Sequence, residues 1–178
     1  MNDADRNTQI DDLLAKQEIA EVVLRYCRGI DRVDPELVRS CYHPDATDEH
    51  GSFSGNVDEF LEWVFRVVSR YSFTMHFVGN LLVELGAPRD AGNRAARAET
   101  YGISHHRTEG AGPGGSLIIG FRYIDRFEQR DGGPWKVARR ICTTEWARID
   151  DEKHRWPIPE GMRSGLRDRT DPVYDPID

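Results

Sequence analysis

At 178 residues, the chain has the length of one ordinary domain and is too short for two. Its net charge of −7 argues against a nucleic-acid-binding surface, which usually carries a basic patch. Since the amino-terminal residues lack the order of a signal peptide and no apolar run approaches the ~20 residues of a membrane span, we expect a cytoplasmic protein without a membrane partner.

The first half of the chain predicts three helices. From Thr8 onward, apolar residues recur at a period near 3.6 and charged residues fill the opposite face, which indicates an amphipathic helix. Asp34 and Pro35 have the residue types of an N-cap and a first helical position, so a second, short helix follows. After an extended segment from Thr47 to Phe53, a third helix is predicted from about Val57 to Tyr71.

The second half predicts four strands, because its apolar pattern changes to a period of two. They cover residues 73–85, 94–108, 116–129 and 135–149. Three helices followed by long antiparallel strands indicate an α+β fold, in which one strongly bent antiparallel sheet receives the helices on its concave face.

We divide the chain into an α+β domain, residues 1–149, and a carboxy-terminal extension, residues 150–178. The extension is rich in Arg, Asp and Pro and shows no clear period. We expect it to strap across a neighbouring subunit or to close the mouth of a pocket.

Two proton-handling residues stand out, Asp31 at the end of the first predicted helix and His76 within the first long strand. A neutral imidazole is a usable base at pH 7, and a carboxylate on its other nitrogen fixes the tautomer and stabilises the imidazolium. Such a pair suits proton abstraction beside a carbonyl, or elimination of water, without a nucleophile or a metal. The alternatives are a core histidine bonded to the backbone and a simple helix-end carboxylate.

Tyr26 precedes Asp31 by five residues, which places it roughly 140° around a helix axis from the carboxylate. Both side chains can still line one broad cavity. There a phenol would polarise a substrate carbonyl or hold a water molecule; the alternative is an aromatic anchor of the core.

The segment from His43 to His50 holds two His and two Asp, which raises the question of a metal site. Pro44 interrupts it, and a strand points alternate side chains to opposite faces, so the ligands would not converge. No HExxH, EF-hand or CxxC spacing is present. We therefore predict no metal and no cofactor, and expect His50 alone to enter the cavity mouth and bind substrate.

Two histidines are adjacent on the predicted strand at 94–108. His105 and His106 must point to opposite faces, so at most one of them serves a concave site. Tyr101 shares a face with His105. These two are candidates for substrate binding, with a surface role as the alternative.

The last predicted strand offers Arg140 and Trp146, which share a face by strand alternation. Arg140 would hold a substrate carboxylate or enolate oxygen, and Trp146 would wall the pocket. Asn80, four residues after His76, would help to stabilise an enolate. A surface or interface role is the alternative for Arg140 and Trp146.

Several segments occur in a familiar order and spacing over roughly residues 8–149: YCRGID, CYHPDATDEHGSFSG, TMHFVGN, AETY and WKVARRI. In them the chain resembles the SnoaL-like branch of the nuclear transport factor 2-like superfamily. The resemblance implies a cone-shaped α+β fold and association into a homodimer or homotrimer through the outer face of the sheet.

At the site, the resemblance is closest to members of the scytalone dehydratase and bile-acid 7α-dehydratase types. It implies that Asp31 and His76 form the catalytic pair, with Tyr26 also catalytic. It further implies that Arg140 corresponds to the arginine that the bile-acid dehydratase type uses on its last strand, and that His105 corresponds to the second pocket histidine of scytalone dehydratase.

These observations lead to one hypothesis and two alternatives. The hypothesis is a cofactor-independent lyase, dehydratase or isomerase that uses a His–Asp general base on a small hydrophobic carbonyl compound, polycyclic or aromatic. The alternatives are a non-catalytic ligand-binding or assembly subunit and a polyketide-type cyclase.

Overall fold

The computed structural model describes residues 3–87, 92–108, 115–151, 153 and 156–177. Its helices are α1 (Asp3–Asp31), α2 (Pro35–Ser40) and α3 (Val57–Val68), with a short 3₁₀ turn at Pro172–Tyr174. Its strands are β1 (Tyr42–His50), β2 (Phe53–Asn56), β3 (Phe73–Leu85), β4 (Arg94–Thr108), β5 (Gly115–Gln129) and β6 (Lys136–Asp151).

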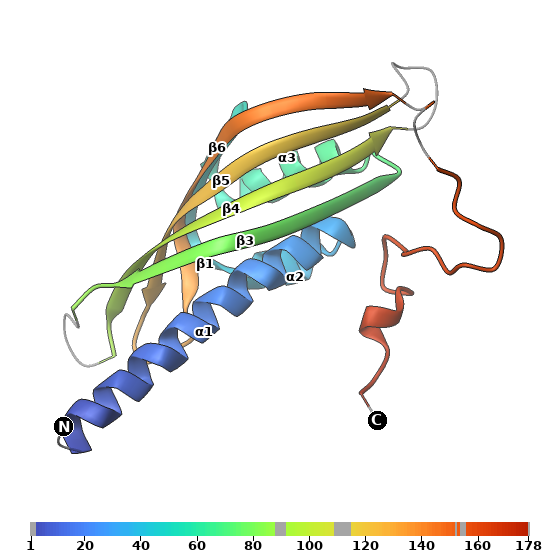
Figure 1. Ribbon diagram of the computed structural model, residues 1–178. Coiled ribbons are helices and arrows are strands. Elements are labelled where there is room, and N and C mark those ends of the chain that lie inside the picture. Colours follow the sequence, from blue (N-terminus) through green and yellow to red (C-terminus); the bar gives the residue numbers. More distant parts are fainter. Residues whose placement is uncertain (1–2, 88–91, 109–114, 152, 154–155, 178) are drawn as a thin grey trace.

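The strands form one sheet in the order β2-β1-β6-β5-β4-β3. Figure 1 shows this sheet curving over the helices, with α1 running along β3. The predicted α+β fold with a strongly bent sheet is therefore confirmed. One detail differs: β1 pairs with β6 in parallel, so the sheet is mixed, and β1 and β2 extend it beyond the four predicted strands.

The helix boundaries follow from their capping residues. Asp34 caps α2 as predicted, because its carboxylate accepts the backbone N–H of Leu37 at 3.1 Å. Asn56 caps α3 by accepting the N–H of Glu59 at 3.0 Å, so this helix begins at the predicted residue. The first helix starts earlier than predicted, at Asp3, where acidic residues in the first turn favour a helix amino terminus.

The core lies between the helices and the concave face of the sheet. Each helix contributes fully buried side chains to it, such as Ile19 from α1, Val38 from α2 and Phe60 from α3. Phe127 of β5 and Val137 of β6 close it from the sheet side. This packing fixes the end of α1, and with it Asp31, against the sheet.

The carboxy-terminal extension folds back onto the helical side of the domain. Arg167 donates to the backbone carbonyls of Val68 and Tyr71, the first of them at 3.1 Å. The hydroxyl of Tyr174 donates to Asp34 at 3.0 Å. The two roles expected for the extension, as a strap across a neighbour or as a pocket closure, stay predictions.

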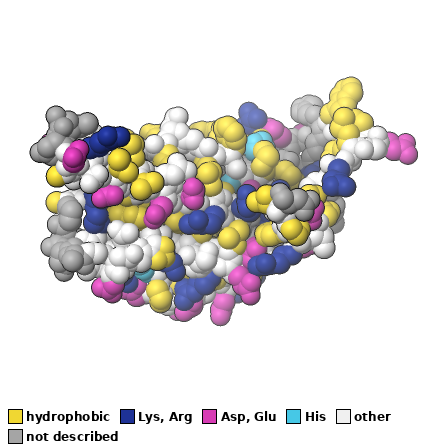
Figure 2. Space-filling view, turned by 90° about the horizontal axis from the view of Figure 1, so that it is seen from below, with side chains coloured by type: hydrophobic (Ala, Val, Ile, Leu, Met, Phe, Trp, Pro, Cys, Tyr) yellow, Lys and Arg dark blue, Asp and Glu magenta, His cyan; other side chains and the backbone are white. Residues whose placement is uncertain are grey.

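Two features bear on partners. Among the described residues, no helix combines the length and the hydropathy needed to cross a membrane. On the face shown in Figure 2, acidic and basic side chains are interspersed with hydrophobic ones.

Candidate active site

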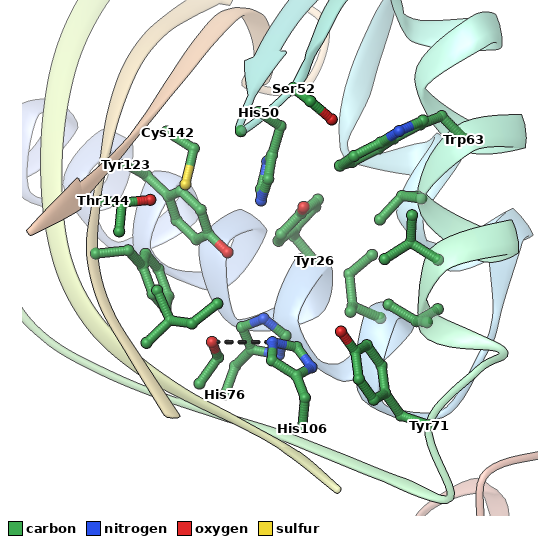
Figure 3. A pocket seen from close by; sticks show the side chains of 18 residues that line it. Tyr26, His50, Ser52, Trp63, Tyr71, His76, His106, Tyr123, Cys142 and Thr144 are labelled. Carbon is green, nitrogen blue, oxygen red and sulfur yellow. Dashed lines mark hydrogen bonds between the residues drawn. The ribbon is translucent and has the colours of Figure 1, made fainter. Parts of the chain in front are cut away.

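A cavity of about 190 Å³ lies between α1, α3 and the concave face of the sheet. Its walls are largely apolar, with valines from α3 and Ile119 and Phe121 from β5. Ionisable side chains enter it from α1, from several strands and from the loop after α3 (Figure 3); the principal ones are Tyr26, His50, Tyr71, His76, His106 and Tyr123. The cavity therefore combines a hydrophobic lining with acid–base groups.

Asp31 and His76 are in hydrogen-bonding contact. The carboxylate Oδ1 lies 2.7 Å from His76 Nδ1, and Oδ2 accepts the backbone N–H of His76 at 2.9 Å. Because a carboxylate only accepts, Nδ1 carries the proton, and Nε2 of the neutral ring is left as the basic nitrogen. His76 lines the cavity and its side chain is only 7% exposed.

The fold explains why this contact forms. Asp31 is the last residue of α1, and β3 is an edge strand of the sheet. The outward backbone groups of an edge strand have no strand partner, so the N–H of His76 is available to the carboxylate. One side chain thus anchors both the backbone and the ring of His76.

Tyr26 and Tyr123 form a second feature of the cavity, from α1 and β5. Their rings meet edge to face at 5.6 Å, and both residues line the cavity. Burial raises the pKa of Tyr26 and that of Tyr123 well above the ordinary value of a phenol. Both hydroxyls therefore stay protonated and can donate hydrogen bonds to a ligand oxygen.

Arg140 does not reach the cavity, which corrects its predicted contact with substrate. It is fully buried and donates two hydrogen bonds to Asp125, at 2.8 and 2.7 Å. Its guanidinium carbon lies 4.1 Å from the ring centre of Tyr26 and 4.0 Å from that of Tyr123. Arg140 therefore supports the two tyrosines from behind the cavity wall.

His50 enters the cavity from the end of β1, as expected. Its Nδ1 lies 3.4 Å from Oδ1 of the fully buried Asp48, whose other oxygen accepts the hydroxyl of Tyr42 at 2.7 Å. Burial opposes the charged form of the ring, but Asp48 and the thiol of Cys142 raise the pKa of His50 to about 9. The ring is therefore an imidazolium at neutral pH.

On β4 the histidine that lines the cavity is His106; His105, the predicted one, does not line it. His106 and Ser104 line the cavity and contact each other at 3.0 Å. Burial and the nearby His76 lower the pKa of His106 to about 4, so this ring is neutral. The sequence contained a clue to this placement. Arg97 and His105 lie an even number of residues apart on one strand and so share a face, and a charged side chain such as Arg97 is expected on the outer, solvent-facing side.

Asn80, Tyr101 and Trp146 are also placed away from the cavity. They line a shallow groove on the outer face of the sheet. For Asn80 and Trp146 a register shift reverses the alternation of side chains between the two faces. The β3–β4 register shifts between Gly79 and Leu82, and the β5–β6 register shifts beside Trp146. None of the three lines the cavity, which differs from the placement expected from the sequence.

No three metal-ligating side chains gather anywhere in the part of the chain that the structure describes. The His43–His50 segment illustrates this, because its side chains separate. His43 contacts the carbonyl of Glu128 at 3.0 Å, and Asp45 pairs with Arg130 at 2.7 Å. Only His50 of this segment lines the cavity.

The curved sheet on three helices, with acid–base groups inside an apolar cavity, defines a class of small α+β proteins built around one central pocket. The family model of the SnoaL-like domain matches residues 11–141, so the chain belongs to the SnoaL-like domain family. The resemblance stated from the sequence is thereby confirmed. No curated protein sequence matches the chain.

Solved structures of similar fold include proteins named as hexachlorocyclohexane dehydrochlorinases and as a scytalone dehydratase. A type 2 hexachlorocyclohexane dehydrochlorinase (LinA) has a TM-score of 0.70 and 19% identity, covering 86% of this chain and 99% of its own. LinA-type3 from Novosphingobium barchaimii has a TM-score of 0.70 and 18% identity, over 84% and 99%. A candidate scytalone dehydratase from Novosphingobium aromaticivorans has a TM-score of 0.64 and 18% identity, over 85% and 99%. At such identities the likeness shows the fold alone.

Proposed function

We propose that this protein is a cofactor-independent lyase of the dehydratase type, with the Asp31–His76 pair as its general base. The observation that carries the proposal is the 2.7 Å contact of Asp31 with His76 Nδ1, because it turns Nε2 into the basic nitrogen of a ring that lines the cavity. The family membership and the dehydratase and dehydrochlorinase neighbours support this class of reaction.

In the proposed reaction, Nε2 of His76 removes a proton from the carbon beside a carbonyl. The electron pair of the broken C–H bond moves onto the carbonyl as an enolate. Tyr26 and Tyr123, whose hydroxyls stay protonated, donate hydrogen bonds to the developing charge, which counts most in a dry cavity. The enolate then expels hydroxide from the next carbon, and protonated His76 returns its proton so that water leaves.

The cavity volume limits the size of the substrate. At about 190 Å³ it lies below the ~300 Å³ at which drug-sized ligand pockets begin. The proposed substrate is therefore a hydrophobic carbonyl compound with one or two rings. A larger polycyclic substrate would require the mouth to open, so the polycyclic option of the sequence hypothesis is the weaker one.

The test measures proton abstraction before any natural substrate is identified. The protein is incubated in D₂O with a panel of one- and two-ring β-hydroxy ketones, and NMR follows deuterium at the carbon beside the carbonyl and formation of the enone. We expect exchange or elimination with at least one member, and its loss in Asp31→Asn. Binding of panel members without exchange or elimination would instead support the alternative of a ligand-binding subunit.

Association into a homodimer or homotrimer also stays part of the proposal. Large apolar side chains are exposed on the outer face of the sheet, among them Phe77, Ile103 and Trp146. Burial of this face between copies would remove them from water. Their exposure is the support for association.

A further inference from the structure

The buried carboxylate of Asp48 needs a positively charged neighbour, and the adjacent side chain that can provide the charge is His50. The carboxylate is fully buried and receives one hydrogen bond from Tyr42. An isolated carboxylate in such a place is costly, so buried charges are normally paired. Arg140 donates through Nε and Nη2 to the two oxygens of Asp125. His50 Nδ1 lies 3.4 Å from Asp48 Oδ1, within ion-pair range, and neither atom has a hydrogen-bond partner in the described part of the chain.

Aromatic rings hold the His50 side chain in place. Its ring centre lies 5.6 Å from that of Phe60, 6.1 Å from Trp63 and 6.0 Å from Tyr123. In Figure 3 the ring extends into the cavity beside Cys142. A charge fixed among apolar rings acts on a ligand far more strongly than the same charge in water.

His50 and His76 stand at opposite ends of one aromatic wall. The ring of Tyr123 is next to that of His50. The ring centre of Phe121 lies 4.6 Å from that of Tyr123, and the ring centre of His76 lies 5.9 Å from that of Phe121. Figure 3 shows His50 and His76 on opposite sides of the same space. A small ligand lying across Tyr123 and Phe121 therefore meets a base at one end and a cation at the other.

The neighbouring ionisable groups do not replace His50 as the cation. His106 is neutral because burial and His76 lower its pKa to about 4. The tyrosines of the wall are neutral phenols, and α3 faces His50 with the aromatic rings of Phe60 and Trp63. The ionisable groups around His50 are Asp48 on β1, Cys142 and Arg140 on β6, Tyr123 and Asp125 on β5, Tyr26 on α1 and His106 on β4.

We propose that protonated His50, beside Asp48, is the cationic oxyanion-binding group of the cavity, acting together with the hydroxyls of Tyr26 and Tyr123, and that the substrate is a carbonyl compound with its leaving group on the β carbon. This inference rests on the proposed function. As His76 takes the α proton, negative charge passes to the carbonyl oxygen at the His50 end, where a fixed donor stabilises it. A chlorinated hydrocarbon develops no such oxyanion, so the site favours dehydration over the reaction named for the LinA structures.

The test uses 4-nitrophenol, a one-ring phenol whose ionised form absorbs visible light and imitates an enolate oxygen. Bound to the wild-type protein, the dye is expected to ionise about one to three pH units below its value in water, the effect of an opposite charge at short range. The double variant Asp48→Asn/His50→Gln removes both charges together, so that no buried ion is left unpaired, and should abolish the shift. Circular dichroism checks that this variant is folded.

His76→Gln is the matched control, because His76 could also accept the proton of the dye. The shift should persist in His76→Gln. If His76→Gln abolished the shift and the double variant kept it, His50 would not be the cation and the proposal would be overturned. The role of His76 as the base would not be affected by that result. A wild-type protein that binds no dye, or binds it without a shift, would overturn it as well.

A second readout needs no variant. The affinity of the wild-type protein for the ionised dye should fall about tenfold or more as the pH rises through about 9, because His50 loses its proton there. An affinity that is flat through this range would contradict a cationic His50. Neither dye measurement depends on turnover, so failure of this inference is distinguishable from failure of the proposed lyase activity.

Discussion

Replacing His76 by glutamine is expected to lower kcat/KM by about 10²–10⁴-fold on a substrate that the wild-type protein turns over, the range that a positioned general base contributes. Asp31→Asn should have an effect of the same order, because an amide can donate to Nδ1 and thus favour the wrong tautomer. Steady-state kinetics measures both effects. Circular dichroism establishes that the fold survives.

The histidines of β4 supply the comparison for this experiment. His105 lies on the outer face of the sheet, where its Cα partners are Met75 and Ile118, so His105→Gln should leave kcat/KM within about twofold. Wild-type rates in both His76→Gln and Asp31→Asn would show that this pair is not the base.

Loss of Arg140 is expected to have the largest effect on stability. Arg140→Leu leaves Asp125 as an unpaired buried carboxylate and removes the cation between the rings of Tyr26 and Tyr123. We expect the free energy of unfolding to fall by about 3–5 kcal/mol, as it does when one partner of a buried ion pair is removed. Urea denaturation measures this loss.

Two further variants decide how the loss arises. Arg140→Met/Asp125→Leu removes the charges together and should recover much of the stability, because no buried ion remains unpaired. Arg97 pairs with Glu84 on the exposed surface, so Arg97→Ala should change the free energy of unfolding by about 1 kcal/mol or less. An Arg140→Leu protein as stable as the Arg97→Ala protein would contradict the structural role assigned to this pair.

Local sequence signals were enough to predict most of the fold. The N-cap at Asp34 and the change in the spacing of apolar residues after α3 both reflect interactions within a few residues. Both are found where they were predicted. The parallel pairing of β1 with β6 was not predictable in this way, because it joins Thr47 with Arg139, which lie about half the chain apart. No periodicity records which distant strands become neighbours.

The site shows the same division between local and distant information. The contact of Asp31 with His76 could be predicted as a hypothesis because the family that the chain resembles pairs a helix-end Asp with a strand His; spacing alone could not show that the two residues meet. Asn80 and Trp146 were misplaced because bulges reverse the alternation beside them, and a bulge leaves little trace in sequence. Arg140 was misassigned because its partner Asp125 is known only once β5 and β6 are paired.

The tautomer of His76 decides whether Asp31 makes this ring a general base. Nitrogen NMR of ¹⁵N-labelled imidazole rings, at a mildly alkaline pH, reports which ring nitrogen carries the proton. We expect a proton on Nδ1, hydrogen-bonded to Asp31, and an unprotonated Nε2, with this preference lost in Asp31→Asn. A His76 ring protonated on Nε2, or one whose tautomers match those of a solvent-exposed histidine and do not respond to Asp31→Asn, would contradict it.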